Sequence, residues 1–184
     1  IRDVVLSRGL GDVYKRQDYI WLNSTAISPA NDSTVWNNTL PTSSVYSMGS
    51  NTWSASTTFV AYCFAEKKGF SRFGKYTGNG NADGPFLYLG FKPAFVIIKR
   101  KTATNNWFMF DNKTSPRNPT NAYLRADTNG SAGSYDWLDL VSNGIKIRNT
   151  SNGANDSNQT YLVFAWAAEP LVANVGQSIP ATAR

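Results

Sequence analysis

The feature that most constrains this chain is an internal repeat of about a hundred residues. The run Thr58–Glu66 is closely matched by Thr160–Glu169, and aligning the two threonines gives an offset of 102 residues. At that offset the aromatic, aliphatic and small positions keep their character, as in Phe59/Tyr161, Val60/Leu162, Tyr62/Phe164, Phe64/Trp166 and Ala65/Ala167. A repeat of this length corresponds to a whole domain rather than a solenoid unit, so the sequence predicts tandem modules.

Composition and turn signals favour strands over helices. Glycine, asparagine, serine and threonine recur along the whole chain, aromatic residues make up 14%, and glutamate occurs only at Glu66 and Glu169. This mixture disfavours helices and favours short strands joined by turns. The sequence therefore predicts an all-β fold, an antiparallel β-sandwich.

The expected strands are short and separated by polar loops. Gly144–Arg148 alternates isoleucine with lysine or arginine, as a half-buried strand does, and Ser142 and Asn143 before it supply a hairpin turn. Proline cannot donate to a ladder, so Lys92 and Pro93 mark a break or bulge. The strand candidates are Tyr19–Leu22, Val45–Met48, Phe59–Phe64, Phe73–Thr77, Phe86–Phe91, Ala94–Lys99, Asn106–Phe110, Tyr123–Ala126, Trp137–Val141, Gly144–Arg148 and Tyr161–Ala167.

The repeat also suggests a domain organisation. Residues 18–68 match the C-terminal half of a module, because the counterparts of the strands in Phe86–Phe110 would fall before residue 17. Residues 69–169 form one complete β-sandwich module, and 170–184 are expected to be an extended C-terminal tail. The sequence leaves open whether the strand at 59–66 pairs with the truncated module or with the complete one.

The first seventeen residues have no counterpart in the module pattern. Asp12–Gln17 resembles the in-frame translation of a transposon end used to build sequencing libraries, so we expect residues 1–17 to be an adapter-derived, non-native segment. The alternative is a native basic arm or short helix. Leaving this segment out lowers the formal net charge from +6 to +4, a modest excess that does not by itself indicate nucleic-acid binding.

Other counts exclude whole classes of chemistry. The chain has no histidine, which removes Ser-His and Cys-His nucleophile systems and histidine-ligated zinc. Cys63 is the only cysteine, so no intramolecular disulfide can form, and its place in an aromatic strand predicts a buried side chain. The longest apolar runs, Ala94–Ile98 and Tyr161–Ala168, are far shorter than a membrane helix, and we expect a soluble protein without a signal peptide or transmembrane segment.

An ordered set of motifs carries a resemblance to a known family. Tyr76–Gly80 reads Tyr-Thr-Gly-Asn-Gly, and Gly90–Lys99 reads Gly-Phe-Lys-Pro-Ala-Phe-Val-Ile-Ile-Lys. Trp107–Asp111, Ser142–Lys146 and the closing Thr160–Glu169 complete the set. With these motifs the chain resembles an uncharacterised tandem module of structural and tail-associated proteins of tailed bacteriophages.

The resemblance implies a fold and a location. It covers residues 70–169 fully and 18–66 as the second half of a preceding copy. Modules of this family look like concanavalin A-like (laminin-G-like) jelly rolls, and none of the motifs is a catalytic signature. The resemblance therefore implies a place in the virion and a structural or binding role, with other virion proteins or further copies of the module as partners.

A short run of residues with side-chain oxygens, from Asn79 to Asp83, is a candidate calcium site. Asn79, Asn81 and Asp83 fit the first ligand positions of a calcium loop, but Gly90 stands where a helix–loop–helix site needs a bidentate glutamate. A lectin-like calcium site at Asn81 and Asp83 is one interpretation, and a tight turn is the other. No other cofactor is expected.

The acidic residues offer little for catalysis. Asp127, Asp136, Asp139 and Asp156 could supply a glycosidase pair only if two of them met, with one in an apolar pocket that raises its pKa. All four lie among serine, asparagine and glycine residues that predict solvated loops. We therefore expect no enzyme activity, with a carbohydrate-active enzyme fragment as the remaining alternative.

Basic residues interleave with aromatic ones in two places. One set comprises Lys67, Lys68, Arg72 and Lys75, and the run Lys99–Lys101 is the other. Single-strand nucleic-acid surfaces use this combination, but edge lysines also keep sheets from pairing with other chains. The second interpretation is favoured, and no nucleic-acid or membrane partner is expected.

Aromatic residues beside polar loops are the better binding candidates. Tyr135 and Trp137, with Asp136 between them, could stack on a sugar ring and hydrogen-bond to it. Trp137 matches Val35 in the other copy, so it could equally belong to the core. The sequence thus predicts a non-enzymatic appendage module, such as part of a tail fibre, that builds structure and contributes to binding of host-surface glycan. The alternative is a purely structural, self-assembling module.

Overall fold

The computed structural model describes residues 5–8, 20–27, 33–39, 42, 44–50 and 62–169, and the structural statements below refer to these residues. They form one helical turn and ten strands. The elements are β1 (Val5–Arg8), α1 (Ser33–Trp36), β2 (Tyr62–Ala65), β3 (Ser71–Thr77), β4 (Phe86–Tyr88), β5 (Pro93–Arg100), β6 (Trp107–Asp111), β7 (Thr120–Arg125), β8 (Gly133–Val141), β9 (Gly144–Ile147) and β10 (Thr160–Ala167).

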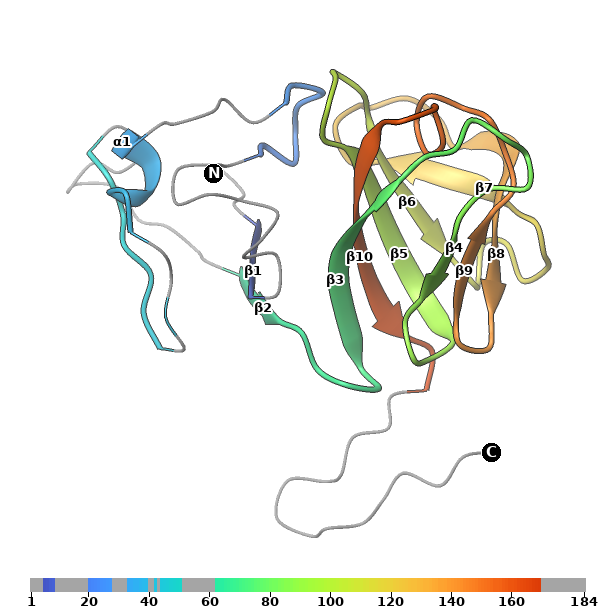
Figure 1. Cartoon of the computed structure of the whole chain (residues 1–184), viewed down its shortest axis with the longest axis horizontal. Helices are drawn as coiled ribbons and strands as arrows, with labels where there is room; N and C mark the ends of the chain where they lie inside the picture. The colour runs from blue at the N-terminus through green and yellow to red at the C-terminus, as the bar shows by residue number, and fades with distance from the viewer. Residues whose placement is uncertain are drawn as a thin grey trace, which may run out of the picture.

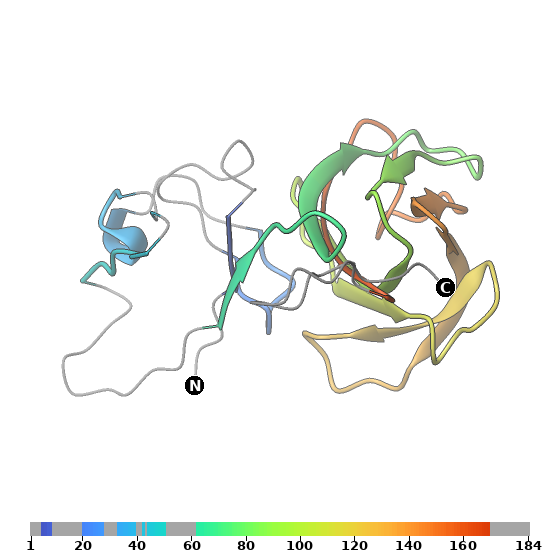
Figure 2. The same cartoon turned by 90° about the horizontal axis from the view of Figure 1, so that it is seen from below.

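Eight of the strands form one antiparallel sheet. Its order is β3-β10-β5-β6-β7-β8-β9-β4, and β1 and β2 pair separately as a two-stranded parallel sheet. Figures 1 and 2 show that the large sheet curls round, so that β4 and β9 face β5 and β10 across the core. The predicted all-β, antiparallel sandwich is therefore confirmed.

The last strand lies between β3 and β5. In β10 the side chains of Tyr161, Val163 and Ala165 point into the core, whereas Leu162, Phe164 and Trp166 lie on the opposite, outer face. All but Trp166 are buried. A strand covered on both faces reads as a continuous apolar run, which is the pattern that made this segment recognisable in the sequence.

The core is built mainly from aromatic and branched side chains. Tyr76 and Tyr161 stack with their ring centroids 5.2 Å apart, and their phenol groups donate hydrogen bonds to the carbonyls of Ala154 and Asn152. Burial raises the pKa of both tyrosines above the ordinary value. Both phenols therefore stay neutral and continue to donate at neutral pH.

All eight predicted strands of residues 69–169 are present, with shifts at their ends. Ile145 and Ile147 are fully buried, as the alternation predicted, and Val141 pairs with Gly144 around a two-residue turn. The expected irregularity at Pro93 is also confirmed. It starts β5, and the register of β10 shifts opposite it.

Three predictions from the first half of the repeat are wrong. Val45–Met48 is not a strand, and within Tyr19–Leu22 Trp21 makes only a single bridge before a turn begins at Leu22. Cys63 is exposed, because among the described strands β2 pairs only with β1, and all four of its residues face solvent. The predicted tail at 170–184 and most of residues 1–17 lie outside the described residues.

A buried asparagine ties the loops together at one end of the sandwich. The amide nitrogen of Asn155 donates to the oxygens of Asn79, Asn81 and Asn149, at 3.0, 2.6 and 2.7 Å. Its carbonyl oxygen accepts from the backbone nitrogen of Asn79 at 2.9 Å. Asn155 is fully buried, so these bonds hold the loops 78–85 and 149–159 against each other.

The substitution Asn155→Asp should strongly destabilise the fold. It keeps the side-chain volume but places a carboxylate against three oxygen acceptors in a buried site, and we expect a loss of about 3 kcal/mol in the free energy of unfolding. Chemical denaturation measures this loss. Asn129→Asp, at an exposed loop position, is the control, and equal stability of the two variants would contradict the assigned role.

Candidate functional site

The predicted sugar-binding residues on β8 do not present one common surface. Trp137 is only 3% exposed and belongs to the core, where its ring lies 4.5 Å from that of Phe108. A side chain at Gly153 would clash with both rings, so the loop backbone lies directly against them and covers Trp137. Tyr135 is 54% exposed and Asp136 is also exposed. Only these two remain open to a ligand, and their role stays a prediction.

Asn81 and Asp83 form a turn held by side-chain bonds. The carbonyl oxygen of the Asn81 side chain accepts from the backbone nitrogen of Asp83 at 2.8 Å. The carboxylate of Asp83 lies 2.7 Å from the ammonium of Lys146, whose hydrogen bond and charge lower the pKa of that carboxyl. A cation at Asp83 would therefore have to displace a lysine.

We expect millimolar calcium to leave the melting temperature unchanged, because Lys146 already neutralises Asp83. The same titration on Lys146→Ala shows whether the lysine is what keeps calcium out. A calcium-dependent rise in the wild-type melting temperature, lost in Asp83→Asn, would instead establish the calcium site.

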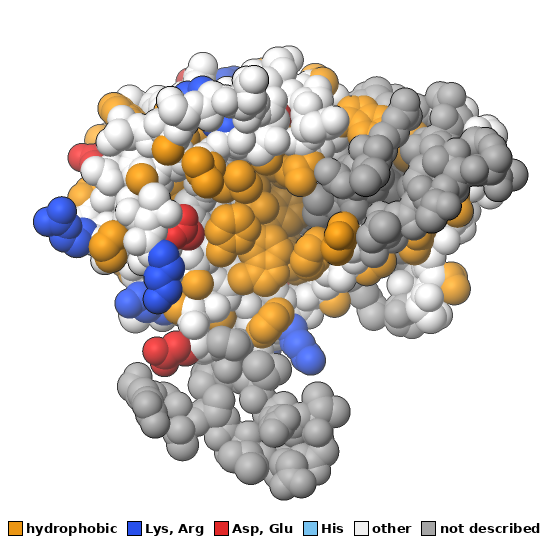
Figure 3. Space-filling view, turned by 180° about the vertical axis from the view of Figure 1, so that it is seen from behind, with side chains coloured by type: hydrophobic (Ala, Val, Ile, Leu, Met, Phe, Trp, Pro, Cys, Tyr) orange, Lys and Arg blue, Asp and Glu red, His pale blue; other side chains and the backbone are white. Residues whose placement is uncertain are grey.

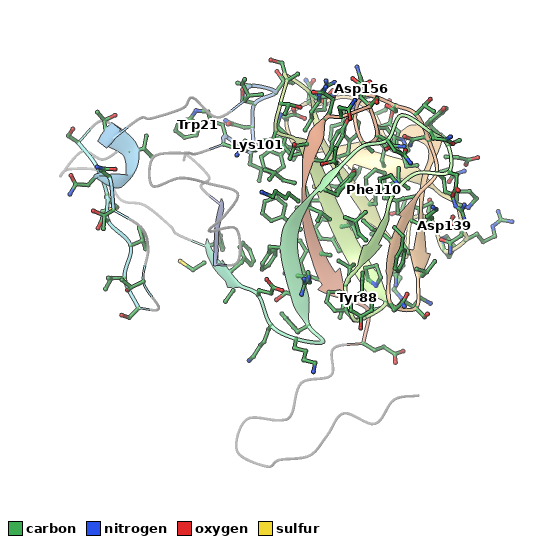
Figure 4. The ribbon with its side chains drawn as sticks, viewed as in Figure 1. Trp21, Tyr88, Lys101, Phe110, Asp139 and Asp156 are labelled. Carbon is green, nitrogen blue, oxygen red and sulfur yellow. The ribbon has the colours of Figure 1, made fainter. Side chains whose placement is uncertain are left out.

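The remaining candidate carboxylates have separate partners. Asp139 lies 2.6 Å from the Arg148 guanidinium, and Asp156 lies 3.1 Å from that of Arg100. Asp127 accepts from Asn106 and from the backbone of Trp107, each at 3.3 Å. Figure 4 shows Asp139 beside β8 and Asp156 at the upper end of the sandwich, well apart from each other. These carboxylates do not form an acid/base pair.

Sequence reasoning missed the surface that the structure makes most distinctive, which is the outer face of strands β3, β10, β5 and β6. Residues opposite one another in the register form rows across these strands. The row at one end is polar, the middle rows are mostly apolar, and the row at the other end is rich in aromatic side chains. The rows are Thr77/Thr160, Lys75/Leu162/Lys99/Trp107, Phe73/Phe164/Ile97/Met109 and Ser71/Trp166/Phe95/Asp111.

The middle of this outer face is covered by an earlier part of the chain. Ile20 and Leu22 pack against the apolar cluster of Phe73, Trp107, Leu162 and Phe164. The indole nitrogen of Trp107 donates to the carbonyl of Trp21 at 2.9 Å. Residues 20–25 thus form an arm that lies on the sheet. Figure 3 shows a hydrophobic area on the face of the molecule seen from behind.

A buried lysine attaches the arm. Lys99 is fully buried, and its ammonium donates to the carbonyl of Thr25 at 2.8 Å and to that of Asn105. It also lies 5.7 Å from the centre of the Trp107 ring. Burial lowers the pKa of Lys99 from its ordinary value of 10.5 to about 8, although the charge of Asp127 opposes this shift.

This lowered pKa predicts an unusual pH dependence of stability. Above pH 8 the unfolded chain holds a proton on Lys99 that the folded chain has lost, so stability increases with pH. From about pH 8 to about pH 9.5, which is below the ordinary pKa of tyrosine, the free energy of unfolding should rise by about 1.5 kcal/mol. Denaturation at each pH measures it.

Lys99→Met is the informative variant, because it removes the titrating group while keeping an unbranched apolar stem. We expect its stability to be nearly flat over the same pH range, whereas the surface control Lys113→Met should keep the wild-type slope. Identical profiles for wild type and Lys99→Met would contradict a lowered pKa at this position.

Aromatic side chains gather at the other end of the outer face. The ring of Trp166 lies 5.5 to 5.6 Å from those of Phe73, Phe95 and Phe64. Phe64 comes from β2, and it is the residue that matches Trp166 in the internal repeat. Phe64 is 37% exposed, and Phe95 and Trp166 are partly buried, so this aromatic cluster is only partly covered by the described residues.

At the polar end the outer face is hollowed. A pocket of about 530 Å³ is lined by Lys75, Tyr76 and Thr77 of β3, by Lys101 and Thr102 after β5, and by Thr160 of β10. Figure 4 labels Lys101 near this upper end. The Lys99–Lys101 run and Lys75 were recognised in the sequence, but nothing local indicated that they share a face.

A family comparison covers nearly the whole chain. The sequence profile of the family described as "Domain of unknown function (DUF7483)" matches residues 3–170. The chain belongs to this family. The matched range includes the arm, β2 and the complete eight-stranded sheet. No curated protein and no solved structure matches the chain significantly.

The described residues also bear on membrane insertion. Among them, no helix is long and apolar enough to cross a membrane.

Proposed function

We propose that this member of the family is a non-enzymatic structural module of a tailed-phage virion, part of a tail fibre or another appendage. In this proposal, neighbouring modules of one chain pack through the outer face of β3, β10 and β5. The motif resemblance supports the virion location, and the geometry of the outer face supports the packing role.

The state of the carboxylates supports a non-enzymatic role. A general acid needs a raised pKa. Partial burial acts to raise the pKa of Asp111, but hydrogen bonds from Thr114 and Lys113 together outweigh it and lower that pKa, and Lys146 lowers the pKa of Asp83. Asp139 and Asp156 form ion pairs with arginines. None of these four carboxylates lines the described pocket between β3, β10 and the end of β5.

The observation that carries the packing role is the contact between Phe64 and Trp166. The two rings meet edge to face with centroids 5.6 Å apart, a geometry worth about 0.5–1.5 kcal/mol beyond burial. The two residues occupy matching positions of the sequence repeat, which supports packing between successive copies. The ion pair between Glu66 and Arg72, at 2.9 Å, lies at the same junction.

A double-mutant cycle on Phe64→Ala and Trp166→Ala tests this contact in the full chain. We expect a coupling of about 1 kcal/mol between the two substitutions in the free energy of unfolding. The control cycle pairs Trp166→Ala with Tyr88→Ala, an exposed aromatic at the opposite edge of the sheet, and should be additive. A Phe64–Trp166 coupling no larger than the control would contradict packing between copies.

The virion location has its own test. Antibodies raised against the chain should label a tail appendage in electron micrographs of particles that carry the gene, and mass spectrometry of purified particles should detect its peptides. Particles that lack the protein while infected cells contain it would contradict the location without affecting the packing result.

A further inference from the structure

We infer that the free edge of β4 is a docking site for a second copy of this chain, which pairs its own β4 antiparallel to it around a two-fold axis at Leu87. The large sheet begins with β3 and ends with β4, so each of these strands has one edge without a partner among the described strands. This contact goes beyond the proposed packing through the outer face of β3, β10 and β5, and it uses none of the residues of that face.

The backbone of β4 has hydrogen-bonding groups that point away from the sheet. On either side of the strand, Pro85 and Leu89 hydrogen-bond to β9 and to the turn before it, at 3.0 and 2.9 Å. In an antiparallel ladder the hydrogen-bonded residues alternate, so Leu87 is the residue of β4 that bonds to β9. The N–H and C=O groups of Phe86 and Tyr88 therefore point to the free edge. The register with β9 is Phe86↔Lys146, Leu87↔Ile145 and Tyr88↔Gly144.

The side chains along this edge are aromatic and exposed. Phe86 is 49% exposed and Tyr88 is 65% exposed, whereas Leu87 between them packs against the core. Both rings thus lie on the outer face of β4, and Figure 4 labels Tyr88 at the lower end of the sandwich. On β9 the residue opposite Tyr88 is Gly144, where a side chain would clash with the carbonyl of Leu87. Tyr88 therefore has no side chain opposite it on β9, and its ring is open to another molecule.

The two free edges of the sheet differ in charge. β3 carries an exposed lysine, Lys75, and lysines on edge strands keep them from pairing with other chains. β4 has no charged residue. On β9, Lys146 lies opposite Phe86, but its ammonium is 2.7 Å from the carboxylate of Asp83. A second copy that approaches β4 therefore meets no uncompensated charge on these strands.

A two-fold axis at Leu87 makes this edge complementary to itself. It places Phe86 of each copy opposite Tyr88 of the other, so the outward backbone groups of these residues exchange both N–H···O bonds of an antiparallel pair. Residues opposite one another lie on the same face, so each Phe86 ring also meets a Tyr88 ring, and aromatic cross-strand pairs stabilise sheets. An isologous contact of this kind specifies a second copy, because one surface supplies both sides.

Sedimentation equilibrium of the full chain tests the association. The contact is small, so we expect a weak dimer with a dissociation constant of about 100 µM. The double variant Phe86→Lys/Tyr88→Lys places like charges at the edge and should weaken the dimer about tenfold or more. Tyr135→Lys, at an exposed aromatic residue of β8, is the matched control and should dimerise like the wild type. Trp166→Ala should also leave the dimer unchanged, which separates this contact from the packing between copies.

Cysteine cross-linking tests the register. All variants also carry Cys63→Ser, because Cys63 is exposed. In a two-fold pair at Leu87, Phe86→Cys of one copy faces Tyr88→Cys of the other, with a Cα separation of about 5.5 Å that a disulfide can span. The mixture of these two variants should form a disulfide-linked dimer about tenfold faster than either variant alone, because only the mixed dimer brings the two thiols together.

A chain that stays monomeric up to about 1 mM would overturn the inference. A dimer that Phe86→Lys/Tyr88→Lys leaves intact would place the contact elsewhere, and equal cross-linking rates in the mixture and in the single variants would exclude the two-fold axis at Leu87. A monomer that shows saturation transfer to a soluble oligosaccharide, lost in the double lysine variant, would assign the edge to glycan instead. Melting temperatures of the variants show that they are folded, and the Phe64–Trp166 cycle is independent of all these results.

Discussion

The pairing of β10 with β3 on one side and β5 on the other is the interaction on which the structure depends. Among the described strands, β3 joins the large sheet only through β10. The two strands are separated by about 80 residues, so closing that loop costs conformational entropy that contacts on both faces of β10 must offset. The inner tyrosine stack and the outer Phe73–Phe164 contact, at 5.8 Å, supply those contacts.

Local patterns predicted the strands whose partners also lie within residues 69–169. Alternation at Ile145 and Ile147 predicted a strand buried on one face, and the continuous apolar run of β10 is the pattern of a strand covered on both faces. The burial of these residues agrees with both patterns. The strand predicted at Val45–Met48 and the burial predicted for Cys63 were wrong, because a local strand pattern does not show whether a partner strand or a covering layer is present. The end of β4 at Tyr88 was missed for another reason. Gly90 has a φ of 80°, and its nitrogen turns to donate to Asn143 at 3.1 Å.

The candidate site was harder to predict than the fold. Trp137 stands beside polar residues in the sequence, yet Gly153 lets a loop lie on its ring and bury it. The sequence suggested that the Asp83 carboxylate could ligate calcium, but in the structure it forms an ion pair with Lys146. Conversely, Lys75, Lys101 and Thr160 line one pocket only because β10 lies between β3 and β5, and no local sequence pattern predicts that strand order.

The burial of the Lys99 amine could not be predicted from local sequence either, because its partner Thr25 is distant in the sequence and lies outside the sheet.

The meeting of Phe64 and Trp166 has a geometric consequence for assembly. Contacts between equivalent positions of two copies are self-complementary, as across a two-fold axis, whereas head-to-tail contacts join different positions and can continue indefinitely. In this chain Trp166 already contacts Phe64, its counterpart in the sequence repeat. Under the proposed packing between copies, a longer array would therefore be a series of pairs, and the contact between one pair and the next would have to use a different surface.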